Sequence, residues 1–266
     1  YVFITLFIYF YYFAKRPNLA VFSLASAIAM KVFPAMLLVL FIRERDYKNL
    51  LKTALLSVVL TLGALALAKG GMRENWSFFS VMQAKYFTQY ILGTSTACCG
   101  LAFGHSIFGI LRLLCAHYSP QSYAAHIGTL LPVYNIFVAV YALVISAYVI
   151  FYERALWKQV ALLVLTFNLL PYVSADYKLI HLFIPVLLFI KAPDTGNSRS
   201  YCVLFALMLI PKSIYQFKGL ISDSGYADIS SSIILNPLLM LLISALIIWE
   251  GGRELVRQKR LKVKST

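Results

Sequence analysis

Residues 18–45 read NLAVFSLASAIAMKVFPAMLLVLFIRER, a long apolar stretch that Lys31 and Pro34 interrupt at its middle. A lysine at the centre of a lipid-facing helix costs about 2.5–3.5 kcal/mol on insertion scales. The proline also removes a backbone donor from the helical ladder. Both are accommodated if two half-helices, at about 18–30 and 33–42, meet in a cavity lined by protein or water. The alternative is a single tilted helix in which Lys31 snorkels to the membrane surface.

Basic clusters flank this stretch on both sides. Lys15-Arg16 precede it, and Arg43-Glu44-Arg45 end it. Lys and Arg concentrate in cytoplasmic connections of membrane proteins. If both clusters are cytoplasmic, the stretch enters the membrane and turns back, which predicts a broken half-helix hairpin.

Further apolar runs lie close to the roughly 20 residues that a bilayer crossing needs. They occupy about 50–68, 127–151, 157–171, 175–190, 200–217 and 232–249. Hydrophobic residues make up 61% of the chain and the mean hydropathy is +0.79. We therefore predict an all-α, polytopic transmembrane helical bundle. Residues 1–266 form one transmembrane domain, which we expect to be the C-terminal part of a longer protein.

The net charge of +14 is concentrated in the connections between these runs and in the tail. Such a distribution indicates membrane topology and argues against nucleic acid as a partner. We expect a multi-pass protein of a bacterial plasma membrane, surrounded by membrane lipids, with residues 250–266 as a basic cytoplasmic tail.

Residues 69–126 form the longest stretch without a crossing, and the predicted topology places them on the outer side. Polar and aromatic residues alternate there, which favours amphipathic helices lying in the membrane interface. The apolar segment at about 101–115 is too short to span and predicts a re-entrant or interfacial helix. It carries His105, Ser106 and Arg112.

The densest polar cluster is SADYK at 174–178, followed by His181. Lys178 and His181 are three residues apart, so they share one face of a helix. One interpretation is a cationic, hydrogen-bonding site for a lipid head group that bears a phosphate or a sugar. The other is structural: Ser174 and Asp176 cap a helix, and Lys178 snorkels to the interface.

Several motifs of soluble enzymes are missing from the sequence. It contains no phosphate-binding Walker loop, no nucleophile elbow, no HExxH metal motif and no dinucleotide-binding glycine motif. We therefore expect no cofactor, and any donor substrate should be carried by a lipid. The sequence shows no cluster of metal ligands and leaves metal dependence open.

Three segments, taken in order along about 18–190, resemble glycosyltransferase family 87. Its members are membrane enzymes of the GT-C fold that use polyprenyl-phosphate sugars. The segments are AMKVFP at 29–34 with the leucines and basic cluster after it, GHSIFGILR at 104–112, and LLPYVSADYKLIH at 169–181. The sequence departs from the family at His105, where an amide is usual, and at 176–178, where DYK replaces a tryptophan-glutamate-histidine pattern.

This resemblance implies an enzyme that transfers a hexose or pentose from a polyprenyl-phosphate donor to a lipid or glycan acceptor of the cell envelope. The general base is then expected upstream of residue 1. Lys31, Arg112 and Lys178 would bind the donor phosphate, with Ser106 and Tyr177 as further substrate-binding residues. The predicted catalytic residues, which would orient sugar hydroxyls or stabilise the leaving group, are Asp176, His181 and His105.

Two other functions fit parts of the same pattern. A transporter or flippase for lipid-linked sugars would share the broken helix and the basic cavity. A non-catalytic subunit of a membrane complex would need no convergence of polar residues on one cavity.

Overall fold

In a computed structural model of the 266-residue chain, residues 1–92, 104–118, 120–192, 197–210, 212, 216–217 and 229–264 are described. Apart from turns and short connections, these residues form helices and one short antiparallel pair of strands, β1 (Gln216–Phe217) and β2 (Ile229–Ser230). The predicted all-α class is therefore confirmed.

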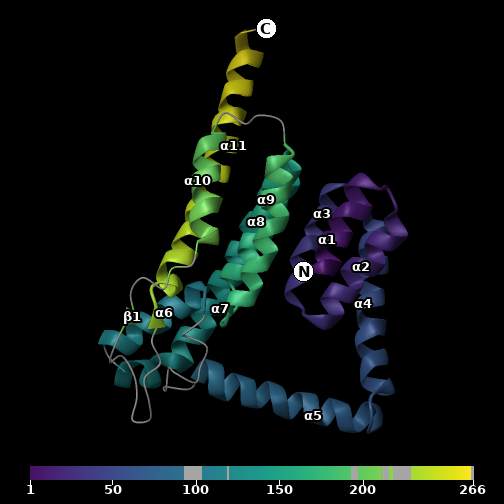
Figure 1. Cartoon of the computed structure of the whole chain (residues 1–266), viewed down its shortest axis with the longest axis vertical. Helices are drawn as coiled ribbons and strands as arrows, with labels where there is room; N and C mark the ends of the chain where they lie inside the picture. The colour runs from purple at the N-terminus through teal and green to yellow at the C-terminus, as the bar shows by residue number, and fades with distance from the viewer. Residues whose placement is uncertain are drawn as a thin grey trace.

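The first part of the chain forms a group of short helices followed by a long one (Figure 1). In order, these are α1 (Val2–Ile8), the π-helix η1 (Tyr9–Phe13), α2 (Pro17–Met30), the 3-10 helix η2 (Phe33–Leu37), α3 (Leu38–Arg43) and α4 (Tyr47–Leu67).

The helix break lies where the sequence predicts it. Helix α2 ends at Met30, and Lys31 is extended, with φ −155° and ψ 129°. The chain becomes helical again at Phe33, and Pro34 lies in the first turn of η2, where a missing N–H costs little.

The chain also turns back, as expected for a hairpin. The Tyr11 hydroxyl donates to Asp46 Oδ2 at 3.1 Å, and the Tyr11 ring packs edge-on against Phe41 at 4.9 Å. The turn after η1 and the turn after α3, which carry the two basic clusters, therefore lie at the same end of the helices. A single tilted helix across 18–42 is excluded. Arg43 Nη1 donates to the Ile150 carbonyl oxygen at 2.6 Å, which brings the end of a later helix to this same end, here called the basic end.

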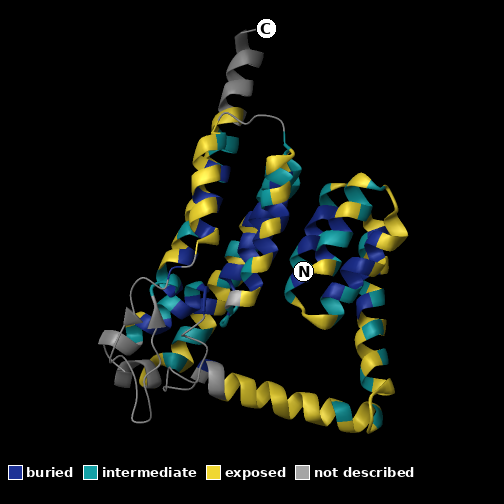
Figure 2. Cartoon of the chain, in the orientation of Figure 1, coloured by how far each residue is buried: buried dark blue, intermediate teal, exposed yellow. Residues whose placement is uncertain are grey.

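A sharp turn connects α4 to α5 (Gly71–Tyr86), which runs across the opposite end of the bundle, transverse to α4 (Figure 1). Gly70 has φ +100°, a left-handed conformation that favours glycine. The Asn75 amide donates to the carbonyl oxygens of Leu65, Ala68 and Gly71 at 2.8–3.1 Å, which ties α5 to the end of α4. Helix α5 has no buried residue, as its colouring in Figure 2 shows. The π-helix η3 (Phe87–Leu92) continues it.

The second part of the chain supplies the remaining helices. They are α6 (Ile107–Tyr118), α7 (Pro120–Phe151), α8 (Leu156–Leu169), the 3-10 helix η4 (Asp176–Leu182), α9 (Phe183–Ile190), α10 (Ser198–Leu209) and α11 (Ser232–Lys264). The end of α11 projects beyond its neighbours (Figure 1).

One predicted crossing is shorter than expected. The apolar run at 200–217 forms a helix only as far as Leu209, and Ile210 is extended, with ψ 131°. Pro211 follows in the sequence, and a residue before proline is disfavoured in the helical region.

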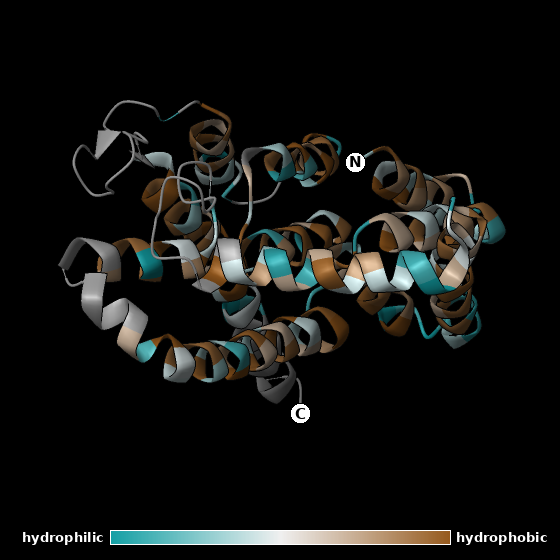
Figure 3. Ribbon diagram, turned by 90° about the horizontal axis from the view of Figure 1, so that it is seen from below, coloured by the Kyte–Doolittle hydropathy of each residue, from teal (hydrophilic) through white to brown (hydrophobic). Residues whose placement is uncertain are grey.

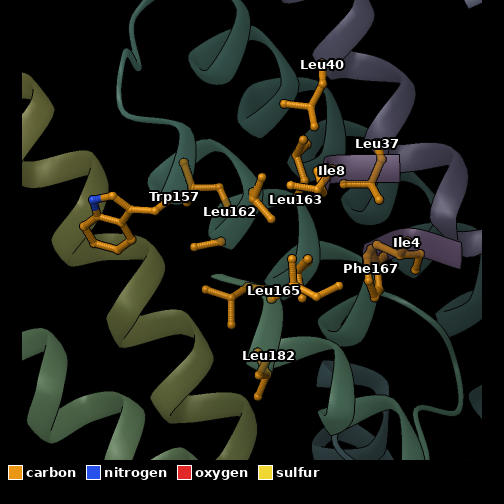
Figure 4. Close-up of a cluster of buried hydrophobic side chains, with 14 of the residues drawn as sticks. Ile4, Ile8, Leu37, Leu40, Trp157, Leu162, Leu163, Leu165, Phe167 and Leu182 are labelled. Carbon is orange, nitrogen blue, oxygen red and sulfur yellow. The ribbon is translucent and has the colours of Figure 1, made fainter. Parts of the chain in front are cut away.

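Within the described part of the chain, three helices are long and apolar enough to cross a membrane: α4, residues Ala125–Phe151 of α7, and Ser232–Glu254 of α11. The other apolar helices are shorter. Helix α8 has only 14 residues, but nearly all of them are buried, because α7, α9, α11 and η2 pack around it. Its side chains form the centre of the core (Figure 4), together with residues from α1, η2, α3 and η4; the labelled members are Ile4, Ile8, Leu37, Leu40, Trp157, Leu162, Leu163, Leu165, Phe167 and Leu182.

Helices α7 and α11 approach closely at Gly251, which predicts a specific cost for adding one methyl group. A Cβ at Gly251 would overlap the Tyr148 hydroxyl oxygen. Overpacking of this kind costs about 1–3 kcal/mol, so Gly251→Ala should lower the thermal unfolding temperature in detergent.

The neighbouring glycine offers a matched control. A Cβ at Gly252 meets nothing within 4 Å. Gly252→Ala should therefore leave stability unchanged or raise it by up to about 1 kcal/mol through helix propensity. Adding Tyr148→Phe to Gly251→Ala removes the overlapping oxygen and should restore most of the loss. Equal stability of the two glycine variants would contradict this helix contact.

Candidate functional site

The helix break brings Lys31 to η4, far along the chain. Lys31 Nζ donates to the Tyr177 hydroxyl at 2.7 Å and lies 4.1 Å from the centre of the Tyr177 ring. The Lys31 side chain is exposed, and the Tyr177 side chain is 58% exposed. Two residues predicted separately to bind substrate are therefore direct neighbours.

Lys178 and His181, further along η4, are both buried. Lys178 Nζ donates to the Val173 carbonyl oxygen at 3.2 Å and lies 4.9 Å from the centre of the Phe33 ring. His181 packs edge-on between the rings of Phe33 and Phe167, at 5.5 and 5.3 Å. We call Lys31, Tyr177, Lys178 and His181 the cationic cluster.

The tautomer of His181 follows from its backbone contact. His181 Nδ1 lies 2.7 Å from the Lys178 carbonyl oxygen. A carbonyl oxygen only accepts hydrogen bonds, so Nδ1 carries the proton. In the neutral ring, Nε2 is then the acceptor.

The cationic cluster has an excess of positive charge. The ammonium groups of Lys31 and Lys178 repel each other, and both act electrostatically on His181. Among the side chains that the structure describes, no carboxylate forms an ion pair with either lysine. Asp176 begins η4, but its side chain lies outside the described part of the structure. Two close ammonium groups favour an anion as their ligand.

A second group of polar residues joins the start of α6 to the segment before η4. Gly104 and Ala175 form an antiparallel bridge, and the His105 N–H donates to the Ser174 carbonyl oxygen at 2.7 Å. The second and third motifs of the sequence analysis therefore lie side by side.

Ser106 is buried and serves as the cap of α6. Its hydroxyl accepts from the Gly109 N–H at 3.0 Å and donates to the Tyr172 carbonyl oxygen at 3.1 Å. A serine that accepts from the N–H three residues on is a standard helix N-cap. Ser106, which the sequence predicts to bind substrate, therefore has a structural role as a helix cap.

Sequence reasoning missed Asn236, which lies in the first turns of α11. Its side-chain nitrogen lies 3.1 Å from His105 Nδ1, and both residues are buried. Buried Asn236 Oδ1 and Ser174 Oγ have no hydrogen-bond partner among the residues that the structure describes. The available signal was an amide followed by Pro237 inside the apolar run at 232–249, since polar groups at membrane depth are costly and mark sites. We call His105, Ser106, Ser174 and Asn236 the polar seam.

The three predicted phosphate-binding residues come from different elements. Lys31 and Lys178 lie together, whereas Arg112 lies on α6, which packs against α7 and α11. Its side chain is only 3% exposed. The cationic cluster, as defined above, contains two of the three predicted cations, Lys31 and Lys178.

An apolar groove of about 310 Å³ opens beside the cationic cluster. It lies between η2, α7 and α8, and Met36, Val138 and Ala142 contribute to its lining. Phe33, which contacts Lys178, also lines it, as does Tyr172 just before Val173. We call it the α8 groove.

No group of three or more His, Cys, Asp or Glu side chains that could hold a metal ion occurs in the described part of the chain. Comparison of the sequence and structure with protein-family models, curated proteins and solved structures finds no match. The functional interpretation therefore rests on the geometry of the site and on the sequence resemblance.

Proposed function

We propose that this chain is a multi-pass membrane glycosyltransferase of GT-C type, which takes a sugar from a polyprenyl phosphate and passes it to a lipid or glycan acceptor. One observation carries the proposal. The helix break presents Lys31 beside the buried Lys178, and the α8 groove begins at the same place.

This arrangement matches a donor with an anionic head and a long apolar tail. The two ammonium groups would bind the phosphate as point charges. The isoprenoid tail would extend along the α8 groove, whose volume of about 310 Å³ and largely apolar lining are typical of small-molecule sites.

The chemistry requires one bond to form and one to break. The acceptor hydroxyl oxygen attacks the anomeric carbon, the bond from that carbon to the phosphate oxygen breaks, and the acceptor proton passes to a general base. The polyprenyl phosphate leaves with the bonding electrons. Lys31 and Lys178 would stabilise the charge that develops on it, and His181 Nε2 is available to accept from a sugar hydroxyl. His105 and Asp176 remain candidates for orienting the sugar.

The proposed topology follows from charge. The basic end holds the turns rich in Lys and Arg, so we assign it to the cytoplasm together with the C-terminus. The cationic cluster and α5 then face the outer side of the membrane, and α5 lies in the interface.

The test uses purified protein in lipid nanodiscs and in sealed vesicles. We expect labelled sugar to move from polyprenyl phosphate into a new covalent product. Movement of the intact donor across the vesicle membrane without a new product would favour a transporter, which also uses broken helices. If neither sugar transfer nor movement of the donor is observed, a non-catalytic subunit is the function that remains.

Filling the α8 groove should weaken donor binding. Ala142 lines the groove, whereas Leu143, the next residue, is 71% exposed. Ala142→Trp should weaken binding of polyprenyl phosphate roughly tenfold, or about 1.4 kcal/mol, because the ring occupies the space of the tail. Leu143→Trp is the matched control and should bind like the wild type. Equal binding by both variants, measured by native mass spectrometry, would place the tail elsewhere.

A further inference from the structure

A second apolar groove, of about 470 Å³, lies on the other side of the helix break. Helices α1, α2, α4 and α5 line it, and the α5 contributions are Trp76 and Phe79. We call it the α5 groove. Seen from below in Figure 3, α5 crosses in front of the bundle, with hydrophilic and hydrophobic residues alternating along it.

The residues of the helix break lie between the two grooves along the chain. Met30 lines the α5 groove and Phe33 lines the α8 groove, so Lys31 and Val32 lie between them in sequence. Lys31 is therefore next in sequence to a residue of the α5 groove and two residues from one of the α8 groove.

Several features indicate what occupies the α5 groove. Its α4 wall, which includes Ala64, belongs to a helix able to cross a membrane, so hydrocarbon chains of the bilayer would reach it directly. Lys31 is exposed beside the groove. The turn before α5 and α5 itself add three more exposed basic residues, Lys69, Arg73 and Lys85, and only one acidic residue, Glu74. This charge complements an anionic head group.

We propose that the α5 groove binds one hydrocarbon chain of an anionic membrane lipid whose head group lies at Lys31. This inference rests on the proposed function and identifies the acceptor as a lipid of this class. The donor occupies the α8 groove, so its sugar would meet the head group of the lipid in the α5 groove at the break. Trp76 and Phe79 would cover the chain, and Asn75 holds α5 in position through its bonds to the end of α4.

The experiment measures occupancy with a photoactivatable phosphatidylglycerol that carries a diazirine in one acyl chain. The full chain in nanodiscs is irradiated, and labelled peptides are mapped by mass spectrometry. We expect labelling of α4 and α5 around Ala64 and Phe79. Ala64→Trp should lower it roughly tenfold, which corresponds to about 1.4 kcal/mol. Leu62→Trp is the matched control, because Leu62 also lies on α4 but is outside the groove and 43% exposed. This variant protein should be labelled like the wild type.

Charge selectivity is the second readout. Lys31→Gln should lower phosphatidylglycerol labelling about fivefold, the factor expected from losing one basic residue near an anionic head group. An analogous phosphatidylcholine should label weakly in both proteins. Equal labelling by the two lipids, or labelling that Ala64→Trp does not change, would overturn the proposal.

The two proposals can fail separately. Labelling requires no donor, so a protein that is labelled in the α5 groove but transfers no sugar would overturn the transferase and leave the lipid site. A protein that transfers sugar but shows no labelling above the level on lipid-facing α7 would overturn the lipid site alone.

Discussion

Replacing Lys178 with methionine should lower the rate of sugar transfer by about 100-fold, without unfolding the protein. Methionine keeps the length of the side chain and its contact with Phe33, but it removes the charge. Loss of one preorganised group that stabilises a developing charge costs about 2.7–4 kcal/mol in known enzymes. The change is measured as the initial rate with polyprenyl-phosphate sugar in nanodiscs.

The stability of this variant should not fall with its activity. Lys178 is only 5% exposed and has no carboxylate partner among the described side chains, and a buried, unpaired charge is costly. We therefore expect Lys178→Met to unfold at the same temperature as the wild type or at a higher one. Lys158→Met is the matched control at the basic end: it breaks the 2.8 Å ion pair with Glu250, so it should lower stability and leave transfer intact. Normal transfer by Lys178→Met would remove this lysine from the reaction.

Replacing Lys31 with alanine should lower the rate of transfer about 10- to 100-fold, the effect of losing one charge-assisted hydrogen bond. Because Lys31 is exposed, its removal leaves no cavity in the core, and the thermal unfolding temperature should stay close to that of the wild type. Lys31→Arg keeps the positive charge and should retain more activity than Lys31→Ala.

Tyr177 provides the control for the role of Lys31. Tyr177→Phe removes the acceptor of the 2.7 Å hydrogen bond but keeps the ring beneath the ammonium. A hydrogen bond to a charged group contributes about 1.5–3 kcal/mol, and this one positions Lys31 without contacting the phosphate. Tyr177→Phe should therefore impair transfer less than Lys31→Ala. If Tyr177→Phe is as impaired as Lys31→Ala, Lys31 positions Tyr177 and does not bind phosphate itself.

Much of the helical framework could be predicted from local patterns. The break between α2 and η2 follows from Lys31 and Pro34, whose costs in an apolar helix are properties of the residues themselves. The shared end of the two basic clusters follows from the positive-inside rule, and the Tyr11 bond to Asp46 agrees with it. The early end of α10 could also have been predicted, because Pro211 follows it in the sequence.

The candidate site could be predicted only in part. The cluster from Ser174 to His181 stood out because charged and polar residues are rare in apolar runs. Its neighbours were not visible in the same way. Asn236 contacts His105 across 131 residues of sequence, and no local rule joins the start of α11 to the start of α6.

By itself, the amino-acid sequence determined where most of the helices lie, where the chain breaks at Lys31 and which turns share one end, because hydropathy, charge and proline act over a few residues. Only the tertiary structure decided that Lys178 is buried while Lys31 is exposed, that Arg112 on α6 is buried, and that an apolar groove flanks each side of the break. The physical reason is that burial and grooves arise where side chains from several helices pack, and that packing depends on shapes and distances which no single segment encodes.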